Sequence, residues 1–283
     1  MQRTLKKWWP VFLLPTVAAF MVGFVWPFLQ GLYLSFCRFI TIDKASWNGI
    51  KNYAYALTDS EFLHAFGFSA AFTVVSTLLI NVAAFAIALA LTRNIKGTNV
   101  FRTVYFMPNL IGGIVLGYIW QILLNCALAL LEKPLLSLDA TYGFWGLVIL
   151  MCWQQIGYMM IIYIAGLQSI PTDYLEAAKI DGANSWQTLW KVKIPNVMPS
   201  ITICLFLTLT NGCKLFDQNL ALTGGEPKHL TEGLALNIYN TFYGRSGAQW
   251  KGYGQAKAVI FCLLVIAISA IQLRATRSKE VQQ

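Results

Sequence analysis

One loop of this chain has residue types and a spacing that suggest a defined role, although not catalysis. Residues 176–195 read Glu-Ala-Ala, then Gly182, and finally Val-Lys-Ile-Pro. Carboxylates elsewhere are scattered, so the sequence predicts neither a catalytic triad nor a metal-ligand cluster. Because this ordered loop lies between two uncharged stretches, we interpret it as a docking site for another protein.

The first half of the loop is predicted to be a short helix that ends at a glycine. Asp173 followed by Glu176 resembles a capping box, which predicts a helix over about 174–181. Gly182 adopts positive φ at no steric cost, so it suits the stop of that helix. The chain is therefore expected to turn at Gly182.

A second short helix is predicted directly after the turn. Asn184 followed by Gln187 has the pattern of an N-terminal cap. The second helix would carry Trp186, Leu189 and Trp190 on one face. An amphipathic loop lying on lipid headgroups is the alternative interpretation, and the loop pattern alone favours neither.

The composition indicates a membrane protein. The chain is 57% hydrophobic and 12% charged, whereas an ordinary soluble domain is roughly a quarter charged. Basic residues that flank apolar segments explain the net charge of +9, so no nucleic-acid partner is expected. The apolar segments of the chain are therefore predicted to contact membrane lipid.

Charge-free runs predict six transmembrane helices in one all-α, polytopic domain over residues 1–283. The spans are expected at about 11–37, 65–92, 103–131, 140–170, 194–213 and 256–273. Crossing about 30 Å of hydrocarbon takes about 20 mostly apolar residues. The last run is short, so we expect Lys257 to snorkel to the interface while Tyr253 and Gln255 extend the helix outward.

The distribution of positive charge predicts the orientation. Most of the 21 basic residues lie in segments 1–10, 93–102, 173–193 and 274–283. The positive-inside rule then places both termini in the cytoplasm. The same rule makes the loop over 172–195 a cytoplasmic helix-turn-helix.

The loop motif resembles a known one. Glu176-Ala177-Ala178, Gly182 and Val192-Lys193-Ile194-Pro195 look like the coupling loop of permease subunits of binding-protein-dependent ABC importers. Ile180-Asp181-Gly182-Ala183, Phe216-Asp217 and Thr223-Gly224-Gly225 are similar to the carbohydrate branch, the maltose-like and glycerol-phosphate-like permeases. Glu226 stands where that branch usually has glycine.

This resemblance implies a sugar transport subunit in the bacterial cytoplasmic (inner) membrane. Its partners would be a second homologous permease subunit, two ABC ATPase subunits and an extracytoplasmic sugar-binding protein. The coupling loop over 172–195 would contact the ATPases. Its docking residues would be Glu176, Ala177, Ala178, Asp181, Gly182, Ala183, Trp186 and Pro195.

The chain is not expected to be an enzyme. No Gly-Lys dipeptide occurs in it, so it lacks a Walker A phosphate loop. We therefore predict no cofactor and no metal in this chain, with ATP and Mg bound by the partner ATPase subunits.

Polar and aromatic residues inside or beside the spans are the candidates for a substrate path. A sugar hydroxyl that leaves water needs donors, acceptors and ring faces in exchange. The candidates are Gln121, Gln154, Tyr158, Asn211, Phe216 and Asp217. The alternatives are bonds between helices and, at the last of these positions, an ion pair with Lys214.

The charge-free runs also bear on the cargo and on other kinds of transport. They contain no basic residue that could neutralise an anionic substrate, which favours a neutral oligosaccharide or polyol. A secondary transporter usually needs intramembrane Asp, Glu or His, and the runs contain none. An autonomous channel or structural membrane protein is the remaining alternative, and co-purification with ATPases would separate the two classes.

Overall fold

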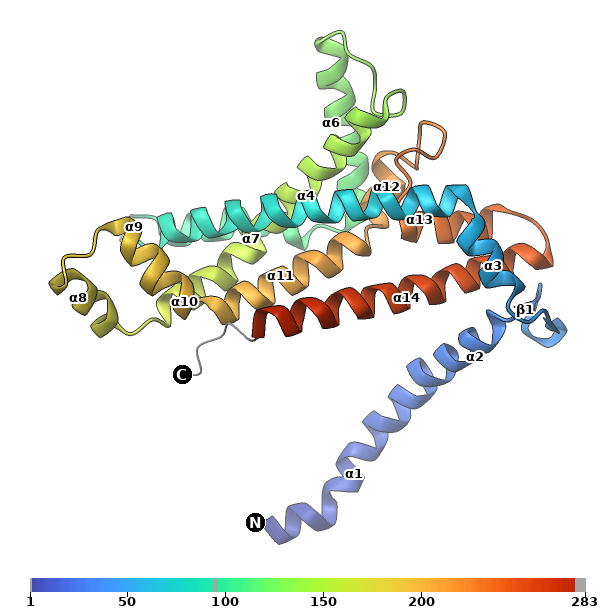
Figure 1. The fold of residues 1–283 in the computed structure, drawn as a ribbon, viewed down its shortest axis with the longest axis horizontal. Coiled ribbons are helices and arrows are strands. Elements are labelled where there is room, and N and C mark those ends of the chain that lie inside the picture. The colour runs from blue at the N-terminus through green and yellow to red at the C-terminus, as the bar shows by residue number, and fades with distance from the viewer. Residues whose placement is uncertain (1, 94–95, 278–283) are drawn as a thin grey trace. The chain divides into compact units, whose positions relative to one another are not determined.

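The chain is almost entirely helical (Figure 1). The computed structural model describes residues 2–93 and 96–277. Its contacts divide it into two compact units, formed by Met1–Asp59 with Ile238–Cys262 and by Ser60–Asn237 with Leu263–Gln283.

The first unit combines a long N-terminal helix with a small hairpin. Its elements are α1 (Gln2–Phe20), the π-helical η1 (Met21–Val25), α2 (Trp26–Leu34), β1 (Cys37–Arg38), the 3-10 turn η2 (Ile42–Lys44), β2 (Ser46–Trp47), α3 (Lys51–Thr58), the π-helical η5 (Asn240–Gly244) and the first part of α14 (Ala248–Arg277). Strands β1 and β2 pair antiparallel. The buried Asn52 Nδ2 donates to the backbone oxygens of Ser35 at 2.8 Å and Cys37 at 2.9 Å, which fixes α3 to this hairpin.

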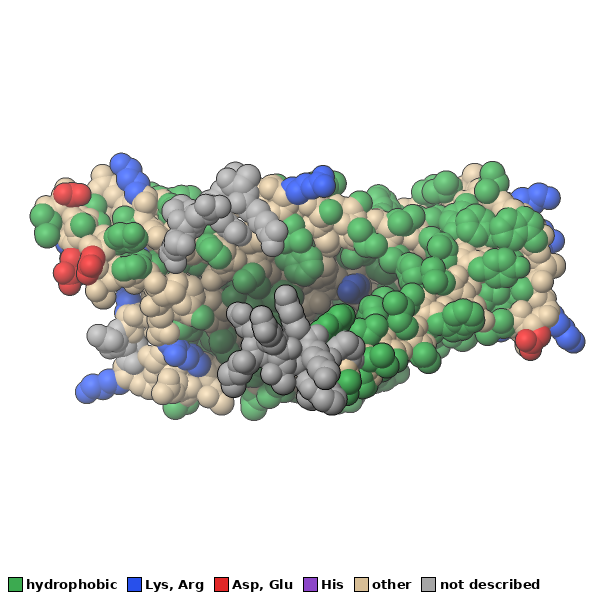
Figure 2. Space-filling view, turned by 90° about the horizontal axis from the view of Figure 1, so that it is seen from below, with side chains coloured by type: hydrophobic (Ala, Val, Ile, Leu, Met, Phe, Trp, Pro, Cys, Tyr) green, Lys and Arg blue, Asp and Glu red, His purple; other side chains and the backbone are tan. Residues whose placement is uncertain are grey.

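The N-terminal helix exposes large apolar side chains. Val22 is 73% and Trp26 is 68% exposed, and the stretch Leu13–Leu34 is long and apolar enough to cross a membrane. Figure 2 shows apolar side chains over much of the visible surface of the molecule. Such a surface is expected where helices face hydrocarbon rather than water.

One sequence prediction is wrong in this unit. Lys257 does not snorkel to the interface, because its side chain is 0% exposed and lies inside α14. Its Nζ atom lies 2.7 Å from Asp59 Oδ2 and 2.8 Å from Thr241 Oγ1. A buried charge is tolerated when it is paired and hydrogen-bonded, and here the carboxylate and the hydroxyl supply both.

The second unit is a bundle of helices. It contains α4 (Ser60–Leu91), α5 (Thr98–Phe106), the 3-10 turn η3 (Met107–Leu110), α6 (Gly113–Leu130), α7 (Ala140–Gln168), α8 (Thr172–Ile180), α9 (Ser185–Thr188), the π-helical η4 (Leu189–Lys193), α10 (Ile194–Asn196), α11 (Met198–Cys213) and α12 (Asp217–Leu222). Helix α13 (Leu234–Tyr239) leads from it into the first unit. Helices α4, α7 and α11 pack on one another, and α12 packs on α6 (Figure 1).

A buried polar bridge joins the three central helices. Asn81 of α4 accepts a hydrogen bond from the Tyr163 hydroxyl of α7 at 2.7 Å and donates to Thr208 Oγ1 of α11 at 2.9 Å. The same helices contribute buried apolar side chains such as Phe72 and Met159 to the core. Interhelical hydrogen bonds of this kind stabilise helix packing in membranes by about 1 kcal/mol.

The all-α fold with apolar spans is confirmed. Among the described residues, five helices are long and apolar enough to cross a membrane, or up to six if the pair Ser185–Asn196 and Met198–Cys213 forms one span bent by 71°. Prolines 195 and 199 flank the bend and remove backbone donors there. The number of spans and the N-in orientation stay predictions.

The stretch predicted as one span over 103–131 is interrupted. Helix α5 ends at Phe106, a 3-10 turn holds Pro108, and α6 begins only at Gly113. Proline and the glycine pair that follows it favour a break, so apolarity alone was a poor guide to continuity. The glycine at position 157 lets α7 approach this break closely, because a Cβ there would collide with the Tyr105 carbonyl oxygen.

Candidate functional site

Two short helical segments, α8 and the run from α9 through η4 to α10, form an elbow between α7 and α11. Gly182 is the joint, with φ of +70°. Its N–H donates to Lys179 O at 3.1 Å, and the Ala183 N–H donates to Ala178 O at 2.9 Å. This pair of bonds is the Schellman motif, which ends α8 in the left-handed conformation that glycine adopts without strain.

The second segment of the elbow begins with a complete capping box. Asn184 Oδ1 accepts from the Gln187 N–H at 2.8 Å, and Gln187 Oε1 accepts from the Asn184 N–H at 2.9 Å. The predicted second cap is therefore confirmed. The predicted first cap is wrong, because α8 begins at Thr172 after Pro171 and no side chain caps it.

A hollow of about 310 Å³ lies on one face of the elbow, which we call the outer hollow. It is lined by Tyr174, Ala177, Ala178, Asp181, Lys191, Val192 and Asn196. The small side chains of the two alanines make this part of the surface recessed, and Ala178 is only 8% exposed. Glu176 is exposed on α8 beside it but does not line it. A protuberance of another protein could enter here without displacing a large side chain.

The elbow also carries an aromatic ridge. Trp186 and Trp190 are 66% and 54% exposed, and their ring centroids lie 5.7 Å apart. Leu189 was predicted to share this face, but it lines a separate cavity together with Lys193. Insertion of the π-helical η4 changes the residue spacing around the helix, so a regular helical period misplaced this leucine.

A second candidate site is a polar cavity of about 190 Å³ inside the bundle, which we call the carboxamide cavity. It is lined by Asn109, Met151, Gln154, Gln155, Asn211, Lys214, Leu215 and Gln218. These residues come from η3, α7, α11, α12 and the turn between the last two. Five of the eight side chains are carboxamides, which both donate and accept hydrogen bonds.

The carboxamides of the cavity are partly bonded to one another. Gln218 Nε2 donates to Gln154 Oε1 at 2.8 Å, and Gln154 Nε2 donates to Ile111 O at 3.2 Å. Asn211 Nδ2 donates to Gln155 Oε1 at 3.2 Å. Among the described residues nothing donates to Asn211 Oδ1, so this oxygen can accept a bond from a ligand hydroxyl.

The structure brings together only two of the six predicted path residues, Gln154 and Asn211. Gln121 Nε2 donates to Leu222 O at 3.0 Å and ties α6 to α12 outside the cavity. The Tyr158 ring packs against Phe106, with centroids 6.3 Å apart. These two side chains therefore hold helices together and do not line the cavity.

Phe216 and Asp217 also lie outside the lining. Asp217 begins α12 and sits against α6, since a Cβ at Gly113 would lie 2.7 Å from the Asp217 Cβ. It forms no ion pair with Lys214 in the part of the chain that the structure describes. Lys214 instead lines the carboxamide cavity with Gln218, a placement that no local pattern in the sequence indicates.

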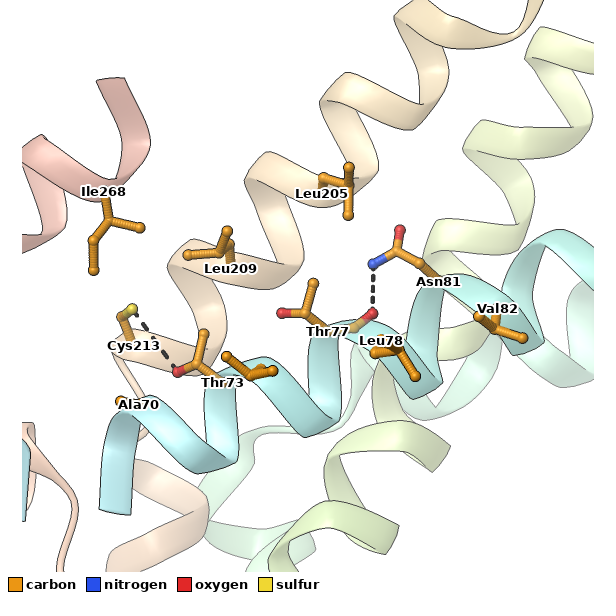
Figure 3. A pocket seen from close by; sticks show the side chains of 11 residues that line it. Ala70, Thr73, Thr77, Leu78, Asn81, Val82, Leu205, Leu209, Cys213 and Ile268 are labelled. Atoms are coloured by element: carbon orange, nitrogen blue, oxygen red, sulfur yellow. Dashed lines mark hydrogen bonds between the residues drawn. The ribbon is translucent and has the colours of Figure 1, made fainter. Parts of the chain in front are cut away.

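An open apolar groove of about 560 Å³ lies between α4 and α11, with Ile268 of α14 also on its lining (Figure 3). Two of its polar side chains bond to the protein, whereas the buried Thr77 Oγ1 has no hydrogen-bond partner among the described residues. Asn81 Nδ2 donates to Thr77 O at 2.8 Å, and Thr73 Oγ1 donates to Cys213 Sγ at 3.8 Å, as the dashed lines show. The remaining lining is aliphatic, with Leu205 as an example, so the groove offers little to a sugar.

Comparison with known families identifies the chain. Residues 83–279 match the model of the "Binding-protein-dependent transport system inner membrane component". The chain belongs to this family. This match spans the elbow, the carboxamide cavity and most of the helical bundle.

Named relatives of this permease family extend over almost the whole chain. The "Probable starch degradation products transport system permease protein AmyD" of Thermoanaerobacterium thermosulfurigenes is 42% identical and covers 97% of this chain and 96% of its own length. The "Multiple sugar-binding transport system permease protein MsmF" of Streptococcus mutans is 33% identical and covers 99% of both. These relatives are transport permeases, and the present chain is a transport subunit and not an enzyme.

A solved structure shares the fold of this permease. It is the crystal structure of a bacterial ABC transporter involved in the import of the acidic polysaccharide alginate. Its matching chain has a TM-score of 0.83 at 18% identity, with 98% of each chain covered. The helical arrangement is therefore that of an ABC transporter permease, and the chain is a multi-pass membrane protein.

Proposed function

We propose that this chain forms half of the translocation path of an ATP-driven sugar importer of the bacterial cytoplasmic membrane. A second homologous permease subunit would supply the other half, and an extracytoplasmic binding protein would deliver the sugar. The names of the two relatives, which mention starch degradation products and multiple sugars, support this assignment. A solved complex of the alginate transporter with a pentasaccharide-bound periplasmic protein supports delivery by such a partner.

The observation that carries the coupling part of the proposal is the fixed geometry of the elbow. A Schellman motif at Gly182 and a capping box at Asn184 hold two short helices at one angle. The outer hollow and the Trp186–Trp190 ridge then present a preformed surface. Preformed surfaces bind with less loss of conformational entropy, which suits a joint that transmits motion.

The proposed division of labour assigns ATP chemistry to two partner ATPase subunits. The chain has no Gly-Lys dipeptide and thus no phosphate loop of the Walker A type. ATP and Mg would bind to the partners, and closure of the ATPase pair would move the elbow. The rest of the bundle would follow, because the elbow continues into α7 and α11 at its two ends.

The proposed cargo is a neutral oligosaccharide or polyol. The carboxamide cavity can exchange hydrogen bonds with hydroxyl groups, and Asn211 Oδ1 has an accepting position open. Leu215 and Met151 provide apolar contact for a sugar ring. Lys214 adds one positive charge at this cavity, so its contribution to choice of cargo needs a separate test.

Co-purification tests the importer assignment. The full chain, tagged and expressed from its own source membrane, should retain two ATPase subunits and a second permease in fixed stoichiometry after mild detergent extraction. Addition of sugar-loaded binding protein should stimulate ATP hydrolysis by that complex. Transport by the purified chain alone, without any ATPase, would overturn the proposal in favour of an autonomous channel or a secondary transporter.

Reversal of charge at the elbow tests the docking surface separately. Glu176→Lys places a cation on the exposed face of α8 beside the outer hollow, and we expect it to release the ATPase subunits while the chain remains inserted. Asp43→Lys is the matched control, because Asp43 is an exposed carboxylate in the first unit. Equal retention of ATPases by the wild type and both variants would exclude docking at Glu176.

A further inference from the structure

A second cavity of the elbow is distinct from the outer hollow, because the two share no lining residue. Its volume is about 570 Å³, and we call it the inner cavity. It is lined by Leu89, Arg93, Leu175, Lys179, Ala183, Ser185, Thr188, Leu189 and Lys193. Helix α8 contributes Leu175 and Lys179, which lie one turn apart, and η4 contributes Leu189 and Lys193. Each segment therefore lines the cavity with one leucine followed four residues later by one lysine.

The described lining of the inner cavity carries positive charge only. Arg93, Lys179 and Lys193 line it, and none of the other described lining residues is a carboxylate. None of the three forms an ion pair within residues 2–93 and 96–277. The outer hollow differs, because it balances Asp181 against Lys191. Three basic side chains around one cavity repel one another unless an anion lies between them.

The apolar part of the lining restricts the kind of anion. Leu89 lies in the last turn of α4, a helix long and apolar enough to cross a membrane, so we expect the cavity to lie near the boundary between hydrocarbon and water. Leu175 and Leu189 continue this apolar surface towards the basic groups. A soluble phosphate would leave these leucines facing water, whereas a phospholipid would cover them with its glycerol and acyl carbons.

We propose that the inner cavity binds the headgroup of an acidic phospholipid. Its phosphate would lie among Arg93, Lys179 and Lys193, and the Ser185 hydroxyl would donate to a phosphate or glycerol oxygen. Basic pockets beside transmembrane helices at a membrane surface bind such headgroups through the same combination of charge and apolar contact. Its lining shares no residue with the outer hollow, although Ala183, one of the predicted docking residues, lines it.

Lipid competition on the full chain tests the proposal. The detergent-purified chain is mixed with equal amounts of phosphatidylglycerol and phosphatidylcholine, and the lipids retained are counted by native mass spectrometry. Each basic residue near a membrane surface contributes about 1 kcal/mol to binding of acidic lipid, or about fivefold in affinity. We expect a preference for phosphatidylglycerol that falls about fivefold in Lys193→Gln and about 100-fold when all three positions are changed to Gln.

Matched variants separate this site from general surface charge. Lys191→Gln removes a lysine of the same π-helical turn that lines the outer hollow, so the lipid preference should not change. Arg93→Lys should retain most of the preference, and circular dichroism checks that each variant is folded. An unaltered preference in the triple variant, or an equal loss in Lys191→Gln, would overturn the proposal.

A soluble anion is the competing occupant, and the same assay distinguishes it. Millimolar inorganic phosphate is added to the wild-type chain together with phosphatidylglycerol. We expect the phosphatidylglycerol adduct to persist, because apolar contacts with Leu89, Leu175 and Leu189 add to the attraction between the basic side chains and the lipid phosphate. Displacement of the lipid with retention of a phosphate adduct would overturn the proposal in favour of a soluble ligand.

Discussion

The elbow and the carboxamide cavity acquire their geometry in opposite ways. The elbow is local, since Gly182, Asn184 and their bonding partners all lie within a few residues of one another. The carboxamide cavity brings together residues as distant in sequence as Asn109 and Gln218. A local joint has few degrees of freedom, and the proposed cargo site is a separate cavity. We therefore expect changes in the elbow to affect transport of every substrate, and changes in the cavity to affect the choice among substrates.

The largest effect is expected at the joint of the elbow. Gly182→Val forces a β-branched residue into the left-handed region, which costs about 1–2 kcal/mol for an ordinary residue and more for valine. The Schellman bonds should break and the two segments should change their angle. Uptake into vesicles reconstituted with the full complex should fall by more than about tenfold for all sugars tested.

Asparagine at the same position provides the matched control. Gly182→Asn should keep most of the uptake, because asparagine tolerates the left-handed conformation better than other residues with a Cβ. Both variants should insert into the membrane in equal amounts, since no heavy atom lies within 4 Å of an added Cβ there. Full uptake by Gly182→Val would show that the angle of the elbow has no role in transport.

The next effect is expected in the carboxamide cavity. Gln154→Leu removes the acceptor of the Gln218 amide and the donor to Ile111 O. The variant should lose one hydrogen bond to the saccharide and the ordering of the Gln218 side chain, which weakens the free energy of binding by about 0.5–1.5 kcal/mol. The uptake KM for a saccharide should rise about three- to tenfold, while the maximal rate changes little.

Gln121→Leu is the control for this prediction. Gln121 is also an intramembrane glutamine, but its amide bonds to Leu222 O between α6 and α12 and lies outside the cavity. Its variant should lower thermal stability without a change in KM. A rise in KM for Gln121→Leu as large as that for Gln154→Leu would place the substrate path elsewhere.

The same contrast explains what sequence alone could predict. Glycine and capping signals identified the elbow, because each depends on neighbours within one or two turns, whereas helix periodicity misplaced Leu189. The cap at Asn184 and the joint at Gly182 appeared where they were expected. The first cap failed, since Pro171 directs the chain into α8 without help from Asp173.

Tertiary contacts set the remaining features, and the sequence could not supply them. Apolarity predicted helices but missed the break after Phe106, where Pro108 and a glycine pair interrupt a long run. Lys257 was expected at the interface because the last apolar run is short. Its ion pair with Asp59 could not be predicted, since the two residues lie far apart in the sequence. Lys214 and Gln218 joined the cavity through the turn between α11 and α12, whose path follows from packing on α6.

Lys214 should affect the choice between neutral and acidic cargo. It is an exposed cation on the cavity lining, where attraction to a carboxylate at about 4 Å is about 1 kcal/mol in water. Lys214→Gln should leave uptake of a neutral oligosaccharide unchanged and weaken competition by a uronate-bearing one about threefold to fivefold. Lys133→Gln, also an exposed lysine, is the control. Weaker uptake of the neutral sugar itself would mean that Lys214 donates to hydroxyl groups.

The smallest effect is expected at the cap of the second elbow segment. Asn184→Ala removes the side-chain acceptor of the Gln187 N–H, and loss of such a cap costs about 1 kcal/mol. Hydrogen exchange of that N–H should become about fivefold faster. Uptake should change by less than about twofold, since Gly182 still ends α8 and sets the turn. Thr172→Ala, at an exposed position of α8, is the control.

The two elbow variants together decide which element fixes the angle. A cap stabilises one end of a four-residue helix, whereas the left-handed residue sets the direction in which the chain leaves α8. If Asn184→Ala reduced uptake as strongly as Gly182→Val, the second segment itself, and not the joint, would have to be rigid for transport. The elbow would then act through the stiffness of the helix that carries Trp186, and its stability would limit transport of every sugar.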